Sequence, residues 1–256
     1  MIAALGGLGV ALGLLTIVWL ASVVRRDASL VDRVWGVGFV ALAAYYWWTA
    51  APGSGVVRVL LFGLVALWGV RLSSYLTWRN WGHGEDYRYQ SMRRATGPRF
   101  WWTNLITVHY LQAVIMWWVS LPLFAGLHGQ VSAGHPLIWF GLVLFGVGFY
   151  FEAAGDWQLA RFRANPANRG RVLDSGVWRY TRHPNYFGDA CLWWGFYCFA
   201  ATAGGGWTLL SPVLMTGLLL KVSGVALLEK KLVETKPHYR DYVARTSSFL
   251  PMPPRQ

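Results

Sequence analysis

Charged side chains are scarce in this chain of 256 residues, where they make up 13% of the sequence against 55% for hydrophobic ones. A soluble domain of this size needs more polar surface, so the composition excludes an ordinary water-soluble protein. Tryptophan, by contrast, occurs 17 times, far above ordinary usage. We therefore predict an all-α polytopic membrane protein.

Cysteine is also nearly absent. Cys191 and Cys198 lie in one apolar stretch, too far apart on a single helix to bridge each other, so no disulfide framework is implied. The histidines, cysteines and acids show no metal-ligand spacing, so a metal enzyme is not expected. His109 lies beside Tyr110 and Gln112 in an apolar run, where we interpret it as a satisfied core residue rather than a ligand.

Long apolar runs predict seven membrane-spanning helices in a single integral-membrane domain. Their lengths are close to the ~20 residues that cross a bilayer. They cover residues 2–24, 34–50, 56–76, 105–127, 137–154, 186–203 and 209–228.

The first run has no basic segment before it, so we interpret it as a span and not as a signal peptide. Its Gly6, Gly7, Gly9 and Gly13 lack the strand and ribose-binding acid of a dinucleotide loop, and we expect them to permit close helix packing.

Acidic residues are half as common as basic ones, 11 against 23, which gives a formal net charge of +12. Most basic residues lie in alternate polar segments, whereas 128–135 and 204–207 contain no Lys or Arg. The positive-inside rule then places the N-terminus outside and the C-terminus in the cytoplasm. This segregation explains the excess charge without a nucleic-acid partner, and nothing indicates an obligate protein partner.

The longest polar interruption, 152–189, is predicted to lie on the cytoplasmic side together with 229–256. Asp156 and Asp189 stand near its ends, and Trp157, Trp178, Tyr180 and Tyr186 alternate with its arginines. Guanidinium groups and aromatic faces suit a large anionic ligand with a flat ring, such as a nucleotide. The alternative is a set of juxtamembrane anchors. The arginines are Arg161, Arg163, Arg169, Arg171, Arg179 and Arg182.

A few charges fall at or within apolar runs, where they are costly and commonly functional. Asp32 and Arg33 lie at the mouth of the second span, Arg71 at the inner end of the third, and Lys221 and Glu229 on or beside the seventh. Asp32 either forms a structural ion pair with Arg71 or another arginine, or has a functional role. We expect Lys221 to face a cavity.

The stretch RYTRHPNYFGD (179–189) resembles the C-terminal signature of the steroid 5-alpha-reductase and sterol-reductase superfamily. Its RHP-x-Y-x-G core also resembles isoprenylcysteine carboxyl methyltransferases, which use S-adenosylmethionine. Asn185 after the proline and Asp189 after the glycine favour the reductases. Further stretches resemble a bacterial branch of that superfamily, known as a domain of unknown function (DUF1295). These are SLVDRVWG (29–36), WGVRLSSYLTWRNWGHGEDYRY (68–89), GDWQLARFR (155–163), LLSPVLMTGLLLKVSGVALLEK (209–230) and KPHYRDYVARTSSFLPMPP (236–254).

The resemblance implies an enzyme of the bacterial cytoplasmic membrane that uses NADPH to reduce a carbon–carbon double bond of a 3-oxo-4-ene steroid or similar enone lipid. It implies that Arg163, Arg171 and Arg182 bind phosphates, while Asn185 and Asp189 contact the nicotinamide carboxamide or ribose. Asp156 would hold another polar edge of the cofactor. The other residues that it implies for the cofactor site are Tyr180, His183, Tyr186, Trp193, Lys221, Glu229, Tyr239 and Tyr242.

The same resemblance places Asp32 near the position of an acid in the steroid reductases and Trp68 at the position of their tyrosine. Because an indole cannot usefully transfer a proton, Tyr75, Tyr87, or a neutral Asp32 whose pKa is raised by burial are alternative donors. The substrate-binding residues that it implies are Trp35, Arg71, Glu85 and Gln112. Two other functions stay open: a membrane methyltransferase, and a non-catalytic lipid-binding or transport protein.

Overall fold

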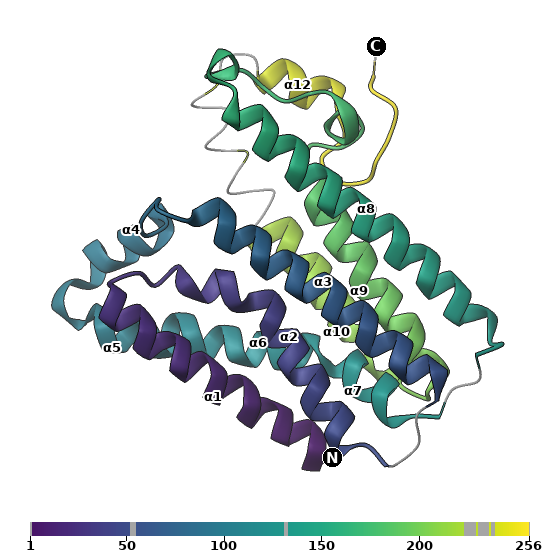
Figure 1. Cartoon of the computed structure of the whole chain (residues 1–256). Helices are drawn as coiled ribbons and strands as arrows, with labels where there is room; N and C mark the ends of the chain where they lie inside the picture. The colour runs from purple at the N-terminus through teal and green to yellow at the C-terminus, as the bar shows by residue number, and fades with distance from the viewer. Residues whose placement is uncertain are drawn as a thin grey trace. The chain divides into compact units, whose positions relative to one another are not determined.

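The computed structural model describes residues 2–51, 55–130, 133–222, 229, 236 and 239–255, and all regular secondary structure in these residues is helical (Figure 1). Within these described residues, four helical stretches are long and apolar enough to cross a membrane: α1 (Ile2–Arg25), α3 (Val56–Asn80), Tyr87–His128 and α8 (Pro136–Ala164). These findings confirm an all-helical protein with the character of a membrane protein.

The chain forms two compact units. The first comprises Met1–Ala133 with Ala200–Gly206, and the second comprises Gly134–Phe199 with Trp207–Gln256.

In the first unit, α2 (Leu30–Thr49) packs against both α1 and α3. Glycine permits these close approaches, because a Cβ atom on Gly36 would lie 2.3 Å from the carbonyl oxygen of Gly69 on α3. On α1, Gly6 and Gly7 face the hydroxyl groups of Tyr45 and Tyr46. The packing role predicted for Gly6 and Gly7 is therefore confirmed. A Cβ atom on Gly9 or Gly13, however, would meet nothing within 4 Å.

The stretch Tyr87–His128 begins well before the predicted span 105–127. The Asp86 carboxylate accepts the backbone N–H of Arg88 and so caps the first helix. Gly97 follows that helix with a φ of +64°, a conformation that suits glycine. The elements of this stretch are α4 (Tyr87–Thr96), η1 (Gly97–Arg99), α5 (Phe100–Asn104), the π-helix η2 (Leu105–Tyr110), α6 (Leu111–Val119) and α7 (Leu121–His128).

His109 lies in the π-helix and has no exposed surface. Its Nδ1 donates to the backbone carbonyl of Asn104 over 3.1 Å, whereas its Nε2 has no hydrogen-bond partner among the described residues. The prediction of a satisfied core histidine therefore holds for one of the two ring nitrogens.

In the second unit, α8 and α9 (Pro184–Thr202) run side by side (Figure 1). Gly141 of α8 faces Gly195 of α9, and Gly148 faces Gly188, so the two helices are antiparallel. Helix α8 has 29 residues, about 44 Å at 1.5 Å per residue, and runs ten residues past the predicted span end at 154. It stops before Pro166, because a proline disfavours helical backbone in the preceding residue.

The described residues also form shorter elements: η3 (Pro166–Asn168), η4 (Gly176–Arg179), η5 (Gly206–Leu209), α10 (Leu210–Gly217), the π-helix η6 (Leu218–Val222) and α12 (Tyr239–Arg245). The end of the predicted span 209–228, residues 223–228, lies outside the described residues, as do 230–235, 237–238 and 256 of the predicted segment 229–256.

The C-terminal segment returns to the residues around the RHP sequence. The Tyr242 hydroxyl donates to the carbonyl of Trp178 over 2.5 Å, and the Thr181 hydroxyl donates to the carbonyl of Phe249 over 2.8 Å. The backbone N–H of Met252 donates to the carbonyl of Tyr180 over 2.9 Å. Distant parts of the sequence thereby meet at one place in the second unit.

Candidate functional site

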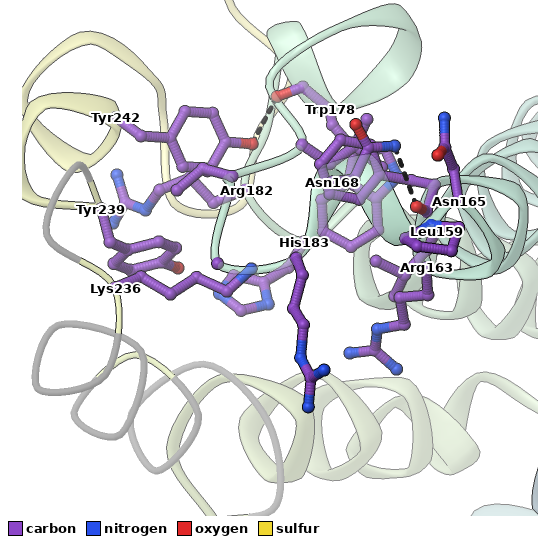
Figure 2. A pocket seen from close by; sticks show the side chains of 16 residues that line it. Leu159, Arg163, Asn165, Asn168, Trp178, Arg182, His183, Lys236, Tyr239 and Tyr242 are labelled. Atoms are coloured by element: carbon purple, nitrogen blue, oxygen red, sulfur yellow. Dashed lines mark hydrogen bonds between the residues drawn. The ribbon is translucent and has the colours of Figure 1, made fainter.

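A cavity of about 410 Å³ lies in the second unit, where the end of α8, the turn after it and the C-terminal segment come together (Figure 2). Its volume falls in the ~300–1,000 Å³ range of small-molecule sites. It is lined by Leu159, Phe162, Arg163, Asn165, Pro166, Asn168, Arg169, Gly170, Val172, Leu173, Trp178, Arg182, His183, Lys236, Tyr239 and Tyr242.

Cations gather around this cavity from different parts of the chain. Arg163 comes from the last turn of α8, Arg169 from the turn after η3, and Lys236 from the C-terminal segment. Burial and the positive charge of Arg163 lower the pKa of Lys236. Among the described residues, the lining contains no Asp or Glu, so an anion entering the cavity would meet the positive charge of these side chains.

Aromatic and amide groups form other parts of the wall. Trp178 is buried, and its indole N–H donates to the carbonyl of Gly155 over 3.1 Å, which fixes the ring against α8. The Asn168 amide donates to the carbonyl of Phe162 over 3.0 Å. Burial raises the pKa of Tyr239 and of Tyr242, so both phenols are neutral. Figure 2 shows Lys236 and Tyr239 on one side of the cavity and Arg163 on the other.

Arg182 lines the cavity, but its donors bind protein atoms. Its Nε and Nη2 donate to the two carboxylate oxygens of Glu229 over 2.7 and 3.2 Å, and its Nη1 donates to the carbonyls of Val243 and Thr246. His183 Nε2 lies 3.1 Å from the same carboxylate. Burial alone would raise the pKa of Glu229, but hydrogen bonds from His183 and Arg182 lower it to about 2. Arg182 therefore holds the C-terminal segment rather than offering a fork to a phosphate.

Of the residues predicted for the cofactor, five line the cavity: Arg163, Arg182, His183, Tyr239 and Tyr242. Glu229 lies behind two of them through its bonds to Arg182 and His183. Arg171 is not among the lining residues described, but its backbone carbonyl accepts a hydrogen bond from the lining residue Lys236 over 2.5 Å.

The remaining predicted residues are absent from the cavity wall. Asn185 donates to buried Asp156 over 3.4 Å, and Tyr186 stacks on His183 with ring centroids 5.4 Å apart. Tyr180 is exposed and accepts from Met252 through its carbonyl. The others are Asp189 on α9, Trp193, which is fully buried there, and Lys221, which is exposed on η6.

Several lining residues were not predicted, namely Asn165, Asn168, Arg169, Trp178 and Lys236. Arg169 and Trp178 belong to the basic aromatic segment, so composition could have included them. The Asn-Pro pair at 165–166 marks the end of α8, and a turn at that point brings the next residues back towards the helix. Lys236 becomes a neighbour only through the tertiary fold.

In the first unit, the predicted acid Asp32 forms an ion pair with an arginine other than Arg71. Arg88 Nη2 lies 2.8 Å from one of its oxygens, and the Tyr89 hydroxyl donates to the other over 2.7 Å. Gln112 in turn donates to the Tyr89 oxygen over 3.4 Å. Asp32 is thus the acceptor at one end of a polar chain, and burial raises the pKa of its carboxyl group although Arg88 and Tyr89 oppose this.

Glu85 lies in the same polar region. Arg93 donates to both of its oxygens over 2.7 and 3.0 Å, and the backbone N–H of Ala28 donates over 2.8 Å. Burial opposes the charge of Glu85, but these bonds lower its pKa overall. Glu85 therefore has a structural role beside its predicted role at the substrate, because its hydrogen bonds connect Arg93 of α4 to Ala28, just before α2.

The other predicted catalytic and substrate residues have different surroundings. Trp68 is fully buried and packs on Phe39, and Trp35 packs on the same ring. Arg71 lies over the ring of Tyr75.

Tyr87 is 47% exposed, and the tyrosine that reaches Asp32 is Tyr89. Side chains two positions apart on an α-helix point in directions about 200° apart. Once Asp86 is recognised as the cap of a helix that begins at Tyr87, Tyr87 and Tyr89 are expected on different faces of that helix.

Comparisons with known proteins give a family but no activity. Residues 18–246 match the family described as "Protein of unknown function (DUF1295)". An uncharacterised protein of the fission yeast Schizosaccharomyces pombe is 27% identical over 266 residues, which cover 92% of this chain and 76% of the yeast protein. No solved structure matches the chain.

Proposed function

The chain belongs to the DUF1295 family, and for this member we propose NADPH-dependent reduction of the carbon–carbon double bond of a 3-oxo-4-ene steroid or similar enone lipid. The proposal follows the resemblance of residues 179–189 to the steroid 5-alpha-reductase superfamily. The observation that carries it is the cavity of the second unit, where Arg163, Arg169 and Lys236 meet aromatic walls and where the described lining residues include no carboxylate.

The donor set of this cavity fits NADPH. In the proposal, Arg163, Arg169 and Lys236 hold the phosphates, because cationic N–H groups make strong hydrogen bonds to phosphate oxygens. The side chains of Asn165 and Asn168 offer amide groups to the ribose or the carboxamide. When bound, NADPH supplies the hydride for the β-carbon of the enone.

The chain's own residues position this site. Arg182 and His183 hold Glu229, and Arg182 also holds the carbonyls of Val243 and Thr246. This clamp keeps the C-terminal segment, with Lys236 and Tyr239, at the cavity. We assign Arg182 a positioning role in place of the phosphate contact that the resemblance implies.

The enone carbonyl needs a hydrogen-bond donor as negative charge develops on its oxygen. We propose that the side-chain amide of Gln112 supplies this donor, because one of its N–H groups donates to the Tyr89 oxygen and the second can donate to the enone. Tyr89, whose single O–H donates to Asp32, orients this amide. Trp68 has no exposed surface and fits this role poorly. The proposal therefore moves the donor from Trp68 or Tyr87 to Gln112, with Tyr89 as the residue that positions it.

For the membrane, we propose seven spans with the N-terminus outside and the cofactor site facing the cytoplasm. Beside the four stretches named above, α2, α9 and the run α10–η6 coincide in sequence with the predicted spans 34–50, 186–203 and the start of 209–228. The segregation of Lys and Arg supports this orientation.

The decisive experiment uses purified protein in detergent. NADPH should raise the melting temperature and should be oxidised when an enone lipid is added, with a product two mass units heavier by mass spectrometry. Arg163→Ala should weaken NADPH binding about ten-fold or more, the order expected for one charged hydrogen bond. Arg161→Ala is the matched control, because Arg161 lies on the same helix over Trp157 and outside the cavity wall.

Two results would count against the proposal. One is stabilisation by S-adenosylmethionine equal to or greater than that by NADPH, which would favour the methyltransferase. The other is equal NADPH affinity in the Arg163 and Arg161 variants.

A further inference from the structure

The first unit has a groove that the proposed reaction does not use. It lies between the start of α2 and the end of α3 and has a volume of about 740 Å³. It is lined by Arg33, Val34, Val37, Ser73, Ser74, Thr77, Trp78 and Trp81.

Hydrogen-bond donors dominate the polar part of this groove. Arg33 uses Nη2 to pair with Asp27 over 2.8 Å, but its Nε–H has no partner among the described residues. The Ser73 oxygen accepts the backbone N–H of Val37 over 2.9 Å, which leaves its own O–H to donate. Ser74 and Thr77 add two hydroxyl groups, and the part of the lining that the structure describes has no carboxylate. This set suits an anion with several oxygen atoms.

The rest of the groove is apolar. Val34 and Val37 form one wall, and the rings of Trp78 and Trp81 are 66% and 72% exposed at the end of α3. Helix α3 is long and apolar enough to cross a membrane. Exposed tryptophans at the end of such a helix are typical of the level of the lipid headgroups. An anion-binding recess therefore lies beside apolar walls at the depth where a phospholipid has its phosphate.

We propose that this groove binds the anionic headgroup of a membrane phospholipid. Arg33 and the hydroxyls of Ser73, Ser74 and Thr77 contact the phosphate, while the valines and tryptophans cover the glycerol and the first acyl carbons. A free phosphate ion would leave the apolar walls unused. A neutral enone, with one acceptor atom, would leave most of the donors unused. The site is independent of the proposed reduction.

Native mass spectrometry of the delipidated protein in detergent tests this site. Titration with dioleoylphosphatidylglycerol should show a saturable one-to-one adduct. Arg33→Gln should weaken it about ten-fold, and Thr77→Val about two- to five-fold, as expected for one charged and one neutral hydrogen bond.

Two matched controls should bind like the unmodified protein. Arg25→Gln removes an exposed cation from the end of α1, and Thr107→Val removes an exposed hydroxyl from η2, both outside the groove. Thr77→Val decides the question if Arg33→Gln fails to fold, because the Thr77 hydroxyl makes no hydrogen bond to the described residues, so its loss should leave the fold intact.

Three outcomes would overturn the proposal. Equal binding of dioleoylphosphatidylcholine would show that the groove does not select an anionic headgroup. Equally tight binding of glycerol 3-phosphate would identify a soluble phosphate ester as the ligand. Unchanged lipid affinity in both Thr77→Val and Arg33→Gln would show that the lipid binds elsewhere. If Arg33→Gln fails to fold, unchanged affinity in Thr77→Val alone would show this.

Discussion

At the residue scale, the arginines near the RHP sequence divide into two kinds. Arg182 is buried and donates to Glu229 and two backbone carbonyls, so its charge is balanced within the protein. Arg163 lines the cavity with its side chain exposed, where a ligand can reach it. The sequence does not distinguish these two arginines. Their surroundings do, because Arg182 binds protein atoms and Arg163 is open to a ligand.

Glu229 should make the stability of the protein sensitive to acid. Its pKa of about 2 lies below its ordinary value of 4.5, so the ionised carboxylate stabilises the fold above about pH 4.5. This stabilisation should be lost as the pH falls from 4.5 towards 2. Glu229→Gln should therefore lower the melting temperature at pH 7, and the difference from the unmodified protein should shrink below pH 4.5. A constant difference across that range would contradict the pairing.

Tyr89 and Tyr87 offer a matched pair of substitutions. Tyr89→Phe leaves the Asp32 carboxylate without one of its donors, which should cost about 1–3 kcal/mol of stability and slow reduction of an enone. Tyr87→Phe removes a hydroxyl from a side chain that is 47% exposed and should change neither property appreciably. Thermal unfolding and turnover measured on both variants check this. Equal turnover in the two variants would remove Tyr89 from the proposed positioning role.

At the scale of elements, glycine spacing sets how closely α8 and α9 approach. Gly141, Gly148 and Gly155 recur every seven residues on α8, and Gly188 and Gly195 recur at the same spacing on α9. These positions bring the backbones together, as small residues do in membrane helix pairs. The close pairing holds the last turn of α8, with Arg163, beside the RHP sequence that begins α9.

Substitution of Gly148 and of Gly146 by alanine distinguishes the effect of helix packing from the effect of helix propensity. A Cβ atom on Gly148 would lie 2.5 Å from the carbonyl oxygen of Gly188, so Gly148→Ala must push the helices apart and should cost about 1–3 kcal/mol. Gly146→Ala meets nothing within 4 Å and should be neutral or stabilise by up to ~1 kcal/mol. Melting temperatures in detergent provide the measurement. Similar values for the two variants would argue against the close contact.

At the scale of the whole molecule, the hydrophobic pattern predicted where helices lie in the sequence better than which residues contact one another in the fold. Apolar runs located the helices, but α8 continues to Ala164 because Gln158, Leu159 and Arg161 still favour helix. The cavity depends on contacts such as Lys236 with Arg171 and Glu229 with Arg182, which join residues 65 and 47 positions apart. A local sequence pattern cannot predict a contact between residues so far apart. The family resemblance therefore identified five residues that line the cavity, and the other lining residues became evident only from the fold.

The proposed topology makes a last prediction about labelling in cells. The loops on the basic side should be cytoplasmic because moving Lys and Arg across the membrane is unfavourable. Ser91 and Ala133 are both exposed and lie on either side of the predicted span 105–127. With Cys191 and Cys198 replaced by Ala, Ala133→Cys should react with a membrane-impermeant maleimide in intact cells, or in spheroplasts if an outer envelope excludes the reagent. Ser91→Cys should react only after the membrane is opened. The reverse pattern would invert the orientation and place residues 77–102 outside, whereas reaction of both sites in intact cells would show that 105–127 does not cross the membrane.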